Sequence, residues 1–137
     1  MRALSVTMAI VLGVAFTLTG VCEEQRVVEA DKLMRREGLL YEINTEVPFT
    51  GIAVSYWPSG GVESESEWRD GKPHGKNKRW YENGQKRREI EFRDGEFHGK
   101  WTVWYENGQK KEETEFRDDK LISRKEWDRD GNLIVEW

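Results

Sequence analysis

The residues that could do chemistry in this sequence recur at an interval of 24. His74 and His98 are 24 residues apart, and so are Glu65, Glu89 and Glu113. If each interval is one β-hairpin, equivalent residues lie two strands, or ~9.6 Å, apart. One zinc ion holds each ligand at ~2 Å, so it cannot use both histidines, which fit a local hydrogen bond at a turn better. The glutamates approach the carboxylate spacing of inverting glycosidases, but a repeated strand position indicates a solvated Glu/Lys ladder.

No other combination of residues points to catalysis. The sequence has no Ser-His-Asp set, no Gly-rich phosphate loop and no metal motif, and its single cysteine excludes a disulfide framework. We expect no catalytic residue, no metal and no cofactor, and therefore a protein that is not an enzyme. With 22 Lys and Arg against 26 Asp and Glu, the net charge is −4, which disfavours nucleic acid as a partner.

Four aromatic residues at matching places are the candidate binding residues. They are Tyr56, Trp80, Trp104 and Trp127. Exposed rings in a row can stack on sugars or anchor a protein partner. They can also stabilise the hairpins through cross-strand pairs, and the two roles are compatible.

The elements that position these residues are internal repeats. The segment Trp80–Lys86 reappears unchanged as Trp104–Lys110, and residues 75–98 and 99–122 are identical at 14 of 24 positions. We place the repeats at 51–74, 75–98 and 99–122, with a partial copy at 123–137, inside a repeat region of 38–137. A lead-in linker is expected at 23–37.

Each repeat has the pattern of a hairpin. Asn83-Gly84 in one copy and Asn107-Gly108 in the next predict two-residue type I′ turns, and Asp-Gly pairs predict turns at the opposite edge. Nothing after residue 50 has helical periodicity. The expected fold is therefore all-β, a single-layer antiparallel meander preceded by an N-terminal signal helix.

The turns also fix a register. A two-residue Asn83-Gly84 loop sets Gly75 opposite Phe92 and Trp80 opposite Arg87. We expect each ring to lie buried across a glycine, and Trp80–Arg87 and Trp104–Lys111 to form cation–π pairs. The row containing Trp80 then lies on the face opposite Phe92. The residues expected to build the repeat are Gly51, Gly75, Gly99, Trp68, Phe92, Phe116, Asn83, Gly84, Asn107 and Gly108.

The first 22 residues have the composition of an export signal. Arg2 precedes an uncharged stretch from Ala3 to Cys22. Three alternatives remain open: a signal cleaved near Gly20, a lipoprotein acylated at Cys22, or an uncleaved anchor. All three predict an exported protein, in the periplasm, cell envelope or extracellular space, that contacts membrane only through this segment or a lipid.

The repeats resemble the bacterial variant of the MORN repeat, known in many bacteria as the antitoxin component of a toxin–antitoxin module. The resemblance rests on Asp-Gly-x-x-His-Gly and Trp-Tyr-Glu-Asn-Gly-Gln-Lys, together with the lead-in Leu33–Tyr41 and Pro48–Gly51. It departs from the pattern at Asp119, where glycine is expected, and at Ile122-Ser123, which replace His-Gly. A weaker resemblance is to the hairpin repeats of choline-binding modules.

The function expected from the sequence is that of an exported, non-catalytic scaffold that binds a protein at the cell envelope. The alternatives are a glycan or cell-wall binding module, and an antitoxin-like neutraliser, which the resemblance implies.

Overall fold

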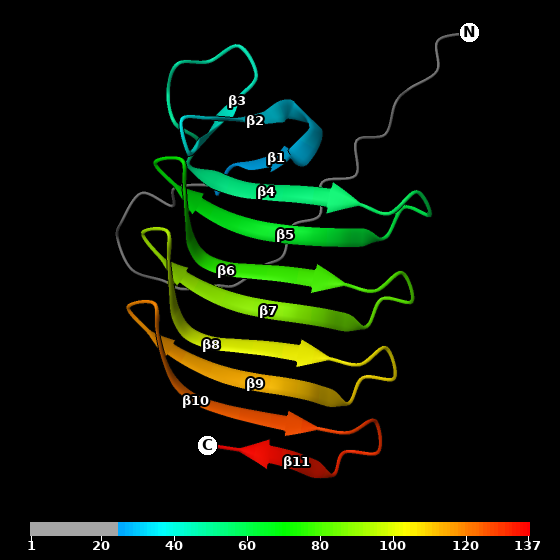
Figure 1. Cartoon of the computed structure of the whole chain (residues 1–137). Coiled ribbons are helices and arrows are strands. Elements are labelled where there is room, and N and C mark those ends of the chain that lie inside the picture. Colours follow the sequence, from blue (N-terminus) through cyan, green and yellow to red (C-terminus); the bar gives the residue numbers. More distant parts are fainter. Residues whose placement is uncertain (1–24) are drawn as a thin grey trace, which may run out of the picture.

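The computed structural model describes residues 25–137, and these form almost entirely β-structure (Figure 1). The predicted signal segment, with Cys22, lies outside the described residues. The elements are β1 (Val27–Glu29), η1, a 3-10 helix (Ala30–Lys32), β2 (Leu33–Arg36), β3 (Leu39–Glu42), β4 (Gly51–Tyr56), β5 (Val62–Arg69), β6 (Lys72–Trp80), β7 (Lys86–Arg93), β8 (Glu96–Trp104), β9 (Lys110–Arg117), β10 (Lys120–Trp127) and β11 (Leu133–Glu136).

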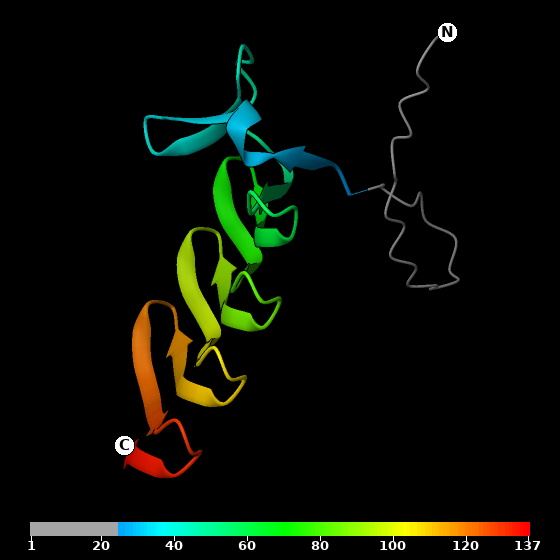
Figure 2. The same ribbon diagram turned by 90° about the vertical axis from the view of Figure 1, so that its right-hand side faces the viewer.

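Nine of these strands form one sheet, and β4 to β11 follow one another in it in sequence order. Every neighbouring pair from β4 to β11 is antiparallel. Figure 2 shows the hairpins stacked in one layer, which confirms the predicted meander. Each strand is joined to the next by a short connection, so every hairpin contacts only its neighbours.

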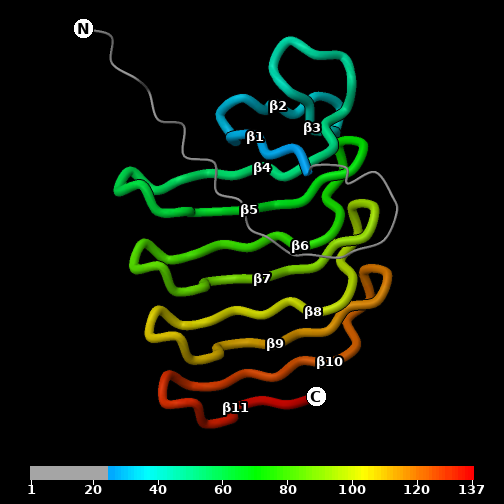
Figure 3. Tube along the Cα trace, turned by 180° about the vertical axis from the view of Figure 1, so that it is seen from behind, coloured from blue at the N-terminus to red at the C-terminus, as the bar shows by residue number. Residues whose placement is uncertain are grey.

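Two kinds of connection alternate along the two edges of the sheet (Figure 3). At one edge, Asp70-Gly71 and Asp94-Gly95 join strands whose flanking residues pair directly, and both residues of each turn have positive φ. These are two-residue type I′ turns. Asp119 takes the second position of the equivalent turn with φ +60, a conformation that aspartate adopts more readily than most residues.

The Asn-Gly connections differ from the prediction. The amide of Tyr81 donates to the carbonyl of Gln85 at 2.8 Å, and the amide of Gly84 donates to the carbonyl of Tyr81 at 3.0 Å. Residues 82–84 therefore form a three-residue loop in which only Gly84 has positive φ. Trp80 consequently pairs with Lys86 instead of Arg87, and Trp104 pairs with Lys110 instead of Lys111.

Away from the loops the predicted register is confirmed. Gly51 pairs with Trp68, Gly75 with Phe92, and Gly99 with Phe116. One bulge next to each loop absorbs the extra loop residue, so the pairing along the rest of the hairpin is the same as for a two-residue turn.

The reason for the glycines at 75 and 99 is different from the one predicted. Between paired Ile90–Trp101 and Phe92–Phe97, the three residues 98–100 stand opposite Glu91 alone. Gly99 adopts φ +73 in this bulge, and a Cβ there would lie 2.5 Å from Oε2 of Glu91. Glycine is required by the backbone and by this carboxylate, and not by an aromatic ring.

The two faces of the sheet differ in chemistry, as predicted. We call the side with Ile90, Phe92, Phe97, Trp101 and Phe116 the aromatic face. The Phe97 ring lies 5.0 Å from Phe92, 5.8 Å from Trp101 and 5.4 Å from Phe116, measured between centroids. The predicted burial of Phe92 and Phe116 is wrong, because both rings are only partly buried in this open layer, whereas Ile90 is 5% exposed.

The N-terminal residues form structure where a linker was expected. Strand β1 pairs in parallel with β4, and β2 pairs with β3 in a separate hairpin. A small core of Val28, Leu40, Phe49 and Ala53 packs between these elements and the first repeat. This packing closes one end of the sheet.

Candidate functional site

The opposite side of the sheet, which we call the ladder face, is built from paired lysines and glutamates. Lys78 Nζ lies 2.8 Å from Glu65 Oε1, and Lys86 Nζ lies 2.7 Å from Glu89 Oε2. Lys110 lies 2.6 Å from Glu113 in the next repeat. The predicted solvated ladder is therefore present, and its glutamates bind lysines.

These pairs shift the pKa values in the directions expected for ion pairs. The hydrogen bond to Glu65 raises the pKa of Lys78, and the hydrogen bond from Lys110 lowers the pKa of Glu113. Burial opposes the charged form of Glu89, but Lys86 and Lys76 outweigh it, and the pKa of Glu89 is lowered. Glu89 and Glu113 are therefore charged at neutral pH.

The candidate row of Tyr56, Trp80, Trp104 and Trp127 occupies this face beside the loops. Trp80 pairs with Lys86 and Trp104 with Lys110 at the bulges. The three tryptophans are partly buried, whereas Tyr56 is 49% exposed. The row crosses four successive hairpins, so a ligand lying along it would contact each of them.

Lysines connect the row from one hairpin to the next. Lys86 Nζ lies 5.3 Å from the Trp104 ring centroid, and Lys110 Nζ lies 5.6 Å from that of Trp127. The predicted pairs of Trp80 with Arg87 and Trp104 with Lys111 do not form; Arg87 and Lys111 lie over tyrosines on the other face. Arg87 is the extra residue of the bulge between the pairs Arg79–Arg88 and Trp80–Lys86. The bulge interrupts the alternation of side chains, so Lys86 lies on the ladder face with Glu89 and Arg87 lies on the aromatic face.

A shallow groove runs beside this row. Its volume is about 330 Å³, and its lining includes Trp104, Thr102, Lys86, Glu89 and Glu113. A second hollow, of about 360 Å³, lies nearer the first repeat. It is lined by Trp57, Val62, Trp80 and Tyr81. Shallow surfaces with aromatic and charged lining suit binding better than catalysis, since they do not enclose a reacting group.

The histidines join successive repeats at the turn edge. His74 Nδ1 lies 3.1 Å from Asp94 Oδ1, and His98 Nδ1 lies 3.5 Å from Asp118 Oδ1. His74 thus makes the hydrogen bond that was predicted at a turn, whereas His98 Nδ1 approaches its aspartate without a hydrogen bond. Among residues 25–137 no group of three or more His, Cys, Asp or Glu side chains is arranged to hold a metal ion.

Sequence reasoning missed the role of the loop tyrosines. The Tyr81 hydroxyl donates to the backbone carbonyl of Trp104 at 2.9 Å, and Tyr105 donates to that of Trp127 at 2.9 Å. The side chain of Asn83 likewise donates to the carbonyl of Glu106 at 3.2 Å. The repetition of Tyr-Glu-Asn-Gly was visible, but these bonds reach into the following repeat and needed the spacing between hairpins.

Within the part of the chain that the structure describes, no helix has the length and apolar character needed to cross a membrane. Comparison with protein families gives a match to the MORN repeat variant at residues 73–94 and 97–118. These segments correspond to the hairpins β6–β7 and β8–β9. Comparisons with curated proteins and with solved structures gave no match.

Proposed function

We propose that this chain, a carrier of MORN-variant repeats, is an exported scaffold without catalytic activity that binds another protein at the cell envelope. MORN repeats are generally interaction scaffolds, which supports a role in binding. The observation that carries the proposal is the aromatic row on the ladder face, because it repeats across four hairpins next to fixed charges.

The geometry of the ladder face favours a protein partner over a small ligand. The surface is long and shallow, and positive lysines alternate with negative glutamates along it. A partner with the complementary order of charges would therefore bind in one orientation. Tryptophan and tyrosine are also the residues that most often anchor protein interfaces. The bound surface would include Trp80 and Trp104 at its centre.

Affinity capture tests this proposal. The full chain and its Trp80→Ala/Trp104→Ala variant would be used to capture proteins from an envelope extract, with bound proteins identified by mass spectrometry. The matched control is Phe97→Ala/Trp101→Ala, which removes two rings from the aromatic face of the same sheet. Circular dichroism would establish that each variant is folded.

The expected result is a partner captured by the unmodified chain and by the control but lost from the Trp80/Trp104 variant. A partner retained in full by the Trp80/Trp104 variant would assign the row a purely structural role. If all variants captured the same proteins as the unmodified chain, the ladder face would be ruled out as the binding surface.

Glycan binding is the second candidate function, and one observation favours it. The hollow of about 360 Å³ is lined by Trp57, Trp80 and Tyr81, and Tyr56, which precedes Trp57 in the chain and pairs with the lining residue Val62, is exposed. Aromatic rings of this kind can stack on sugar rings. A glycan array, or a cell-wall pull-down, with Tyr56→Ala as the variant, distinguishes this function from protein binding.

Export is the other part of the proposal, and it rests on sequence. Arg2 and the uncharged stretch from Ala3 to Cys22 support it. A reporter that is active only outside the cytoplasm, fused after residue 137, should be active. Cytoplasmic activity alone would contradict export. In a Cys22→Ser variant, loss of membrane association would support acylation, and unchanged association would exclude it.

A further inference from the structure

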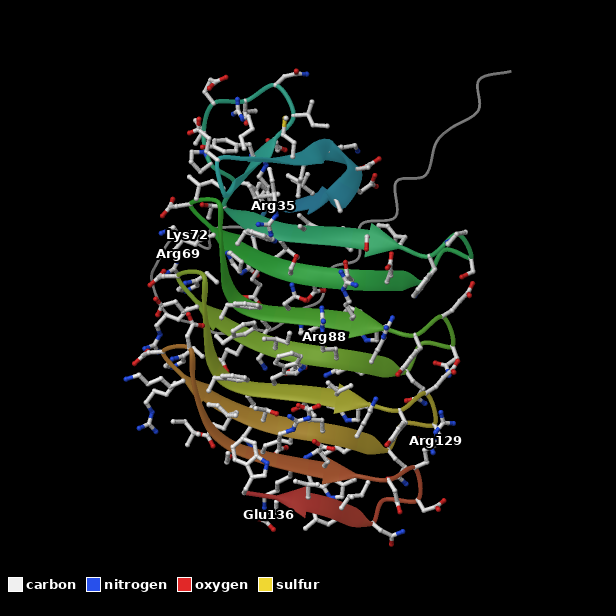
Figure 4. The ribbon with its side chains drawn as sticks, in the orientation of Figure 1. Arg35, Arg69, Lys72, Arg88, Arg129 and Glu136 are labelled. Carbon is white, nitrogen blue, oxygen red and sulfur yellow. The ribbon has the colours of Figure 1, made fainter. Side chains whose placement is uncertain are left out.

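The aromatic face contains a hollow that the proposed function does not use. It lies at the loop edge, beside the loops of the second and third repeats and of the partial copy, and has a volume of about 420 Å³. In Figure 4 the loop residue Arg129 marks this edge of the sheet, and Arg88 lies nearer its middle. We call it the basic hollow, because three of its lining residues are cations and one, Glu106, is an acid. The lining residues are Tyr81, Tyr105, Arg87, Lys111, Arg129, Val103, Asn107 and Glu106.

The rings of the basic hollow are held in place. The hydroxyls of Tyr81 and Tyr105 are both used in hydrogen bonds to backbone carbonyls of the next repeat. Arg87 lies 5.6 Å from the Tyr81 ring centroid, and Lys111 and Arg129 lie 5.7 and 5.6 Å from that of Tyr105. Each ring thus positions at least one cation, which lowers the entropic cost of binding a ligand there.

The cations of the basic hollow lack acidic partners. Within residues 25–137, no ion pair within 4.0 Å involves Arg87, Lys111 or Arg129. The lysines of the ladder face differ, since Lys78, Lys86 and Lys110 each have a glutamate within 2.8 Å.

More positive charge lies next to the hollow. Arg79 and Arg88 pair directly across β6 and β7, an arrangement of like charges that is unfavourable by itself. The Nε of Arg88 is buried without a hydrogen-bond acceptor. Burial, with Arg79 and Arg87 nearby, lowers the pKa of Arg88, as expected where positive charge is in excess.

We propose that the basic hollow and the Arg79–Arg88 pair bind a carboxylate-rich segment of a polypeptide partner. Guanidinium groups match carboxylates with two parallel hydrogen bonds, and here they are fixed beside tyrosine rings that can pack on the segment's backbone and methylenes. Successive hairpins repeat every ~9.6 Å, so a segment running across them would meet a new cation at each repeat.

Charge around the hollow selects a narrow segment over a broad polyanion. The loop tips carry Glu82, Glu106 and Asp130, all exposed, and the chain as a whole has a net charge of −4. A flat anionic membrane or a nucleic acid would meet these acids as well as the cations. An acidic peptide that lies across the face meets Glu106 at the rim of the hollow but not Glu82 or Asp130, which are absent from its lining.

Fluorescence anisotropy with a fluorescein-labelled hexaglutamate peptide tests the proposal on the full chain. The variant is Arg87→Gln/Lys111→Gln/Arg129→Gln. The control is Lys76→Gln/Lys78→Gln/Lys100→Gln, which removes an equal number of positive charges, three, from the ladder face. Circular dichroism verifies that both are folded.

The hollow variant should bind the peptide about tenfold more weakly, as expected for three partly exposed ion pairs, and the control should bind within about twofold of the unmodified chain. Raising the salt from about 20 to about 200 mM should weaken binding as well. Trp80→Ala/Trp104→Ala should still bind the peptide, so the result is independent of the ladder-face proposal.

Three outcomes would overturn the proposal. One is the absence of peptide binding by the unmodified chain. Another is an equal loss in the hollow variant and the control, which would mean that only net charge matters. The third is binding to vesicles of phosphatidylglycerol, lost in the hollow variant, without peptide binding; this would assign the hollow to a membrane surface.

Discussion

Single glycines determine how tightly neighbouring hairpins approach each other. Gly99 sits in a bulge with φ +73, and the carboxylate of Glu91 on the adjacent strand occupies the space that a side chain would need. Gly84 has a similar φ of +85, yet a Cβ there would meet nothing within 4 Å. The two positions therefore separate the cost of backbone conformation from the cost of close packing.

The first prediction uses this difference. Gly84→Ala should lower the free energy of unfolding by about 1–2 kcal/mol, the cost of an alanine in the left-handed region. Gly99→Ala should cost more, because its methyl group also displaces Glu91. In a Glu91→Ala background the Gly99→Ala cost should fall to that of Gly84→Ala. Urea unfolding of the four variants measures this, and an unchanged Gly99→Ala cost would refute the role of Glu91.

The second prediction concerns the few buried side chains of the repeats. Ile90 is 5% exposed, whereas the Phe92 ring is partly exposed. Ile90→Ala should lower the free energy of unfolding by about 2–4 kcal/mol, and Phe92→Ala by about 1–2 kcal/mol, because water already contacts part of the ring. The two melting temperatures decide the order, and a larger loss for Phe92→Ala would contradict it.

At the scale of strands and turns, alternation and turn residues predicted most of the sheet. The Asp-Gly turns and the pairing of Gly75 with Phe92 follow from sequence alone. The Asn83-Gly84 loop could not be resolved, because this dipeptide suits both two-residue and three-residue loops. The three-residue loop is accompanied by hydrogen bonds from Tyr81 and Asn83 to the next repeat, and these are tertiary contacts.

The candidate row was predictable only in part, for a related reason. Alternation placed Trp80 and Trp104 on one face, but their burial depends on lysines that reach across from another strand. Lys86 pairs with Trp80 in the register and yet lies over the Trp104 ring. The sequence does not show which tryptophan ring each lysine contacts, because that depends on the packing of successive hairpins.

The third prediction is a pH dependence of the ladder. Lys110, with Lys100 and Lys125, lowers the pKa of Glu113 below its ordinary 4.5. A lowered pKa means that the charged form stabilises the fold, so this contribution is present above about pH 4.5 and is lost as the pH falls through the lowered value. Glu113→Gln should therefore cost ~0.2–1 kcal/mol at neutral pH and nothing at about pH 2.

Chemical unfolding across this pH range measures the effect. Glu82→Gln, a change in an exposed loop, is the control and should differ little from the unmodified chain at any pH. A Glu113→Gln cost that stays constant down to about pH 2 would mean that the carboxylate charge is not what stabilises the β8–β10 region.

At the scale of the whole molecule, stability depends on contacts between neighbouring hairpins. Such arrays unfold from their ends, because a terminal unit has a neighbour on one side only. Strand β11 pairs only with β10, while β1, β2 and β3 cover the other end. The Tyr105 hydroxyl ties the β8–β9 hairpin to Trp127, the last residue of β10.

The fourth prediction is that Tyr105→Phe loosens the C-terminal hairpin selectively. Loss of one hydrogen bond, ~0.5–1.5 kcal/mol, should speed amide hydrogen exchange in β10 and β11 by roughly 2–10-fold and leave β4 to β7 unchanged. Tyr56→Phe is the control. Equal acceleration in all strands would show that the array opens as a single unit.

The forward-reaching tyrosine bond also bears on how such a chain evolves. Tyr81 and Tyr105 each donate to a backbone carbonyl, so the acceptor is present whatever side chain follows. An in-frame duplication of 24 residues would therefore bring its own donor and meet a ready acceptor. Unequal recombination between the near-identical copies could lengthen the protein by two strands, ~9.6 Å, without a compensating mutation at the new junction.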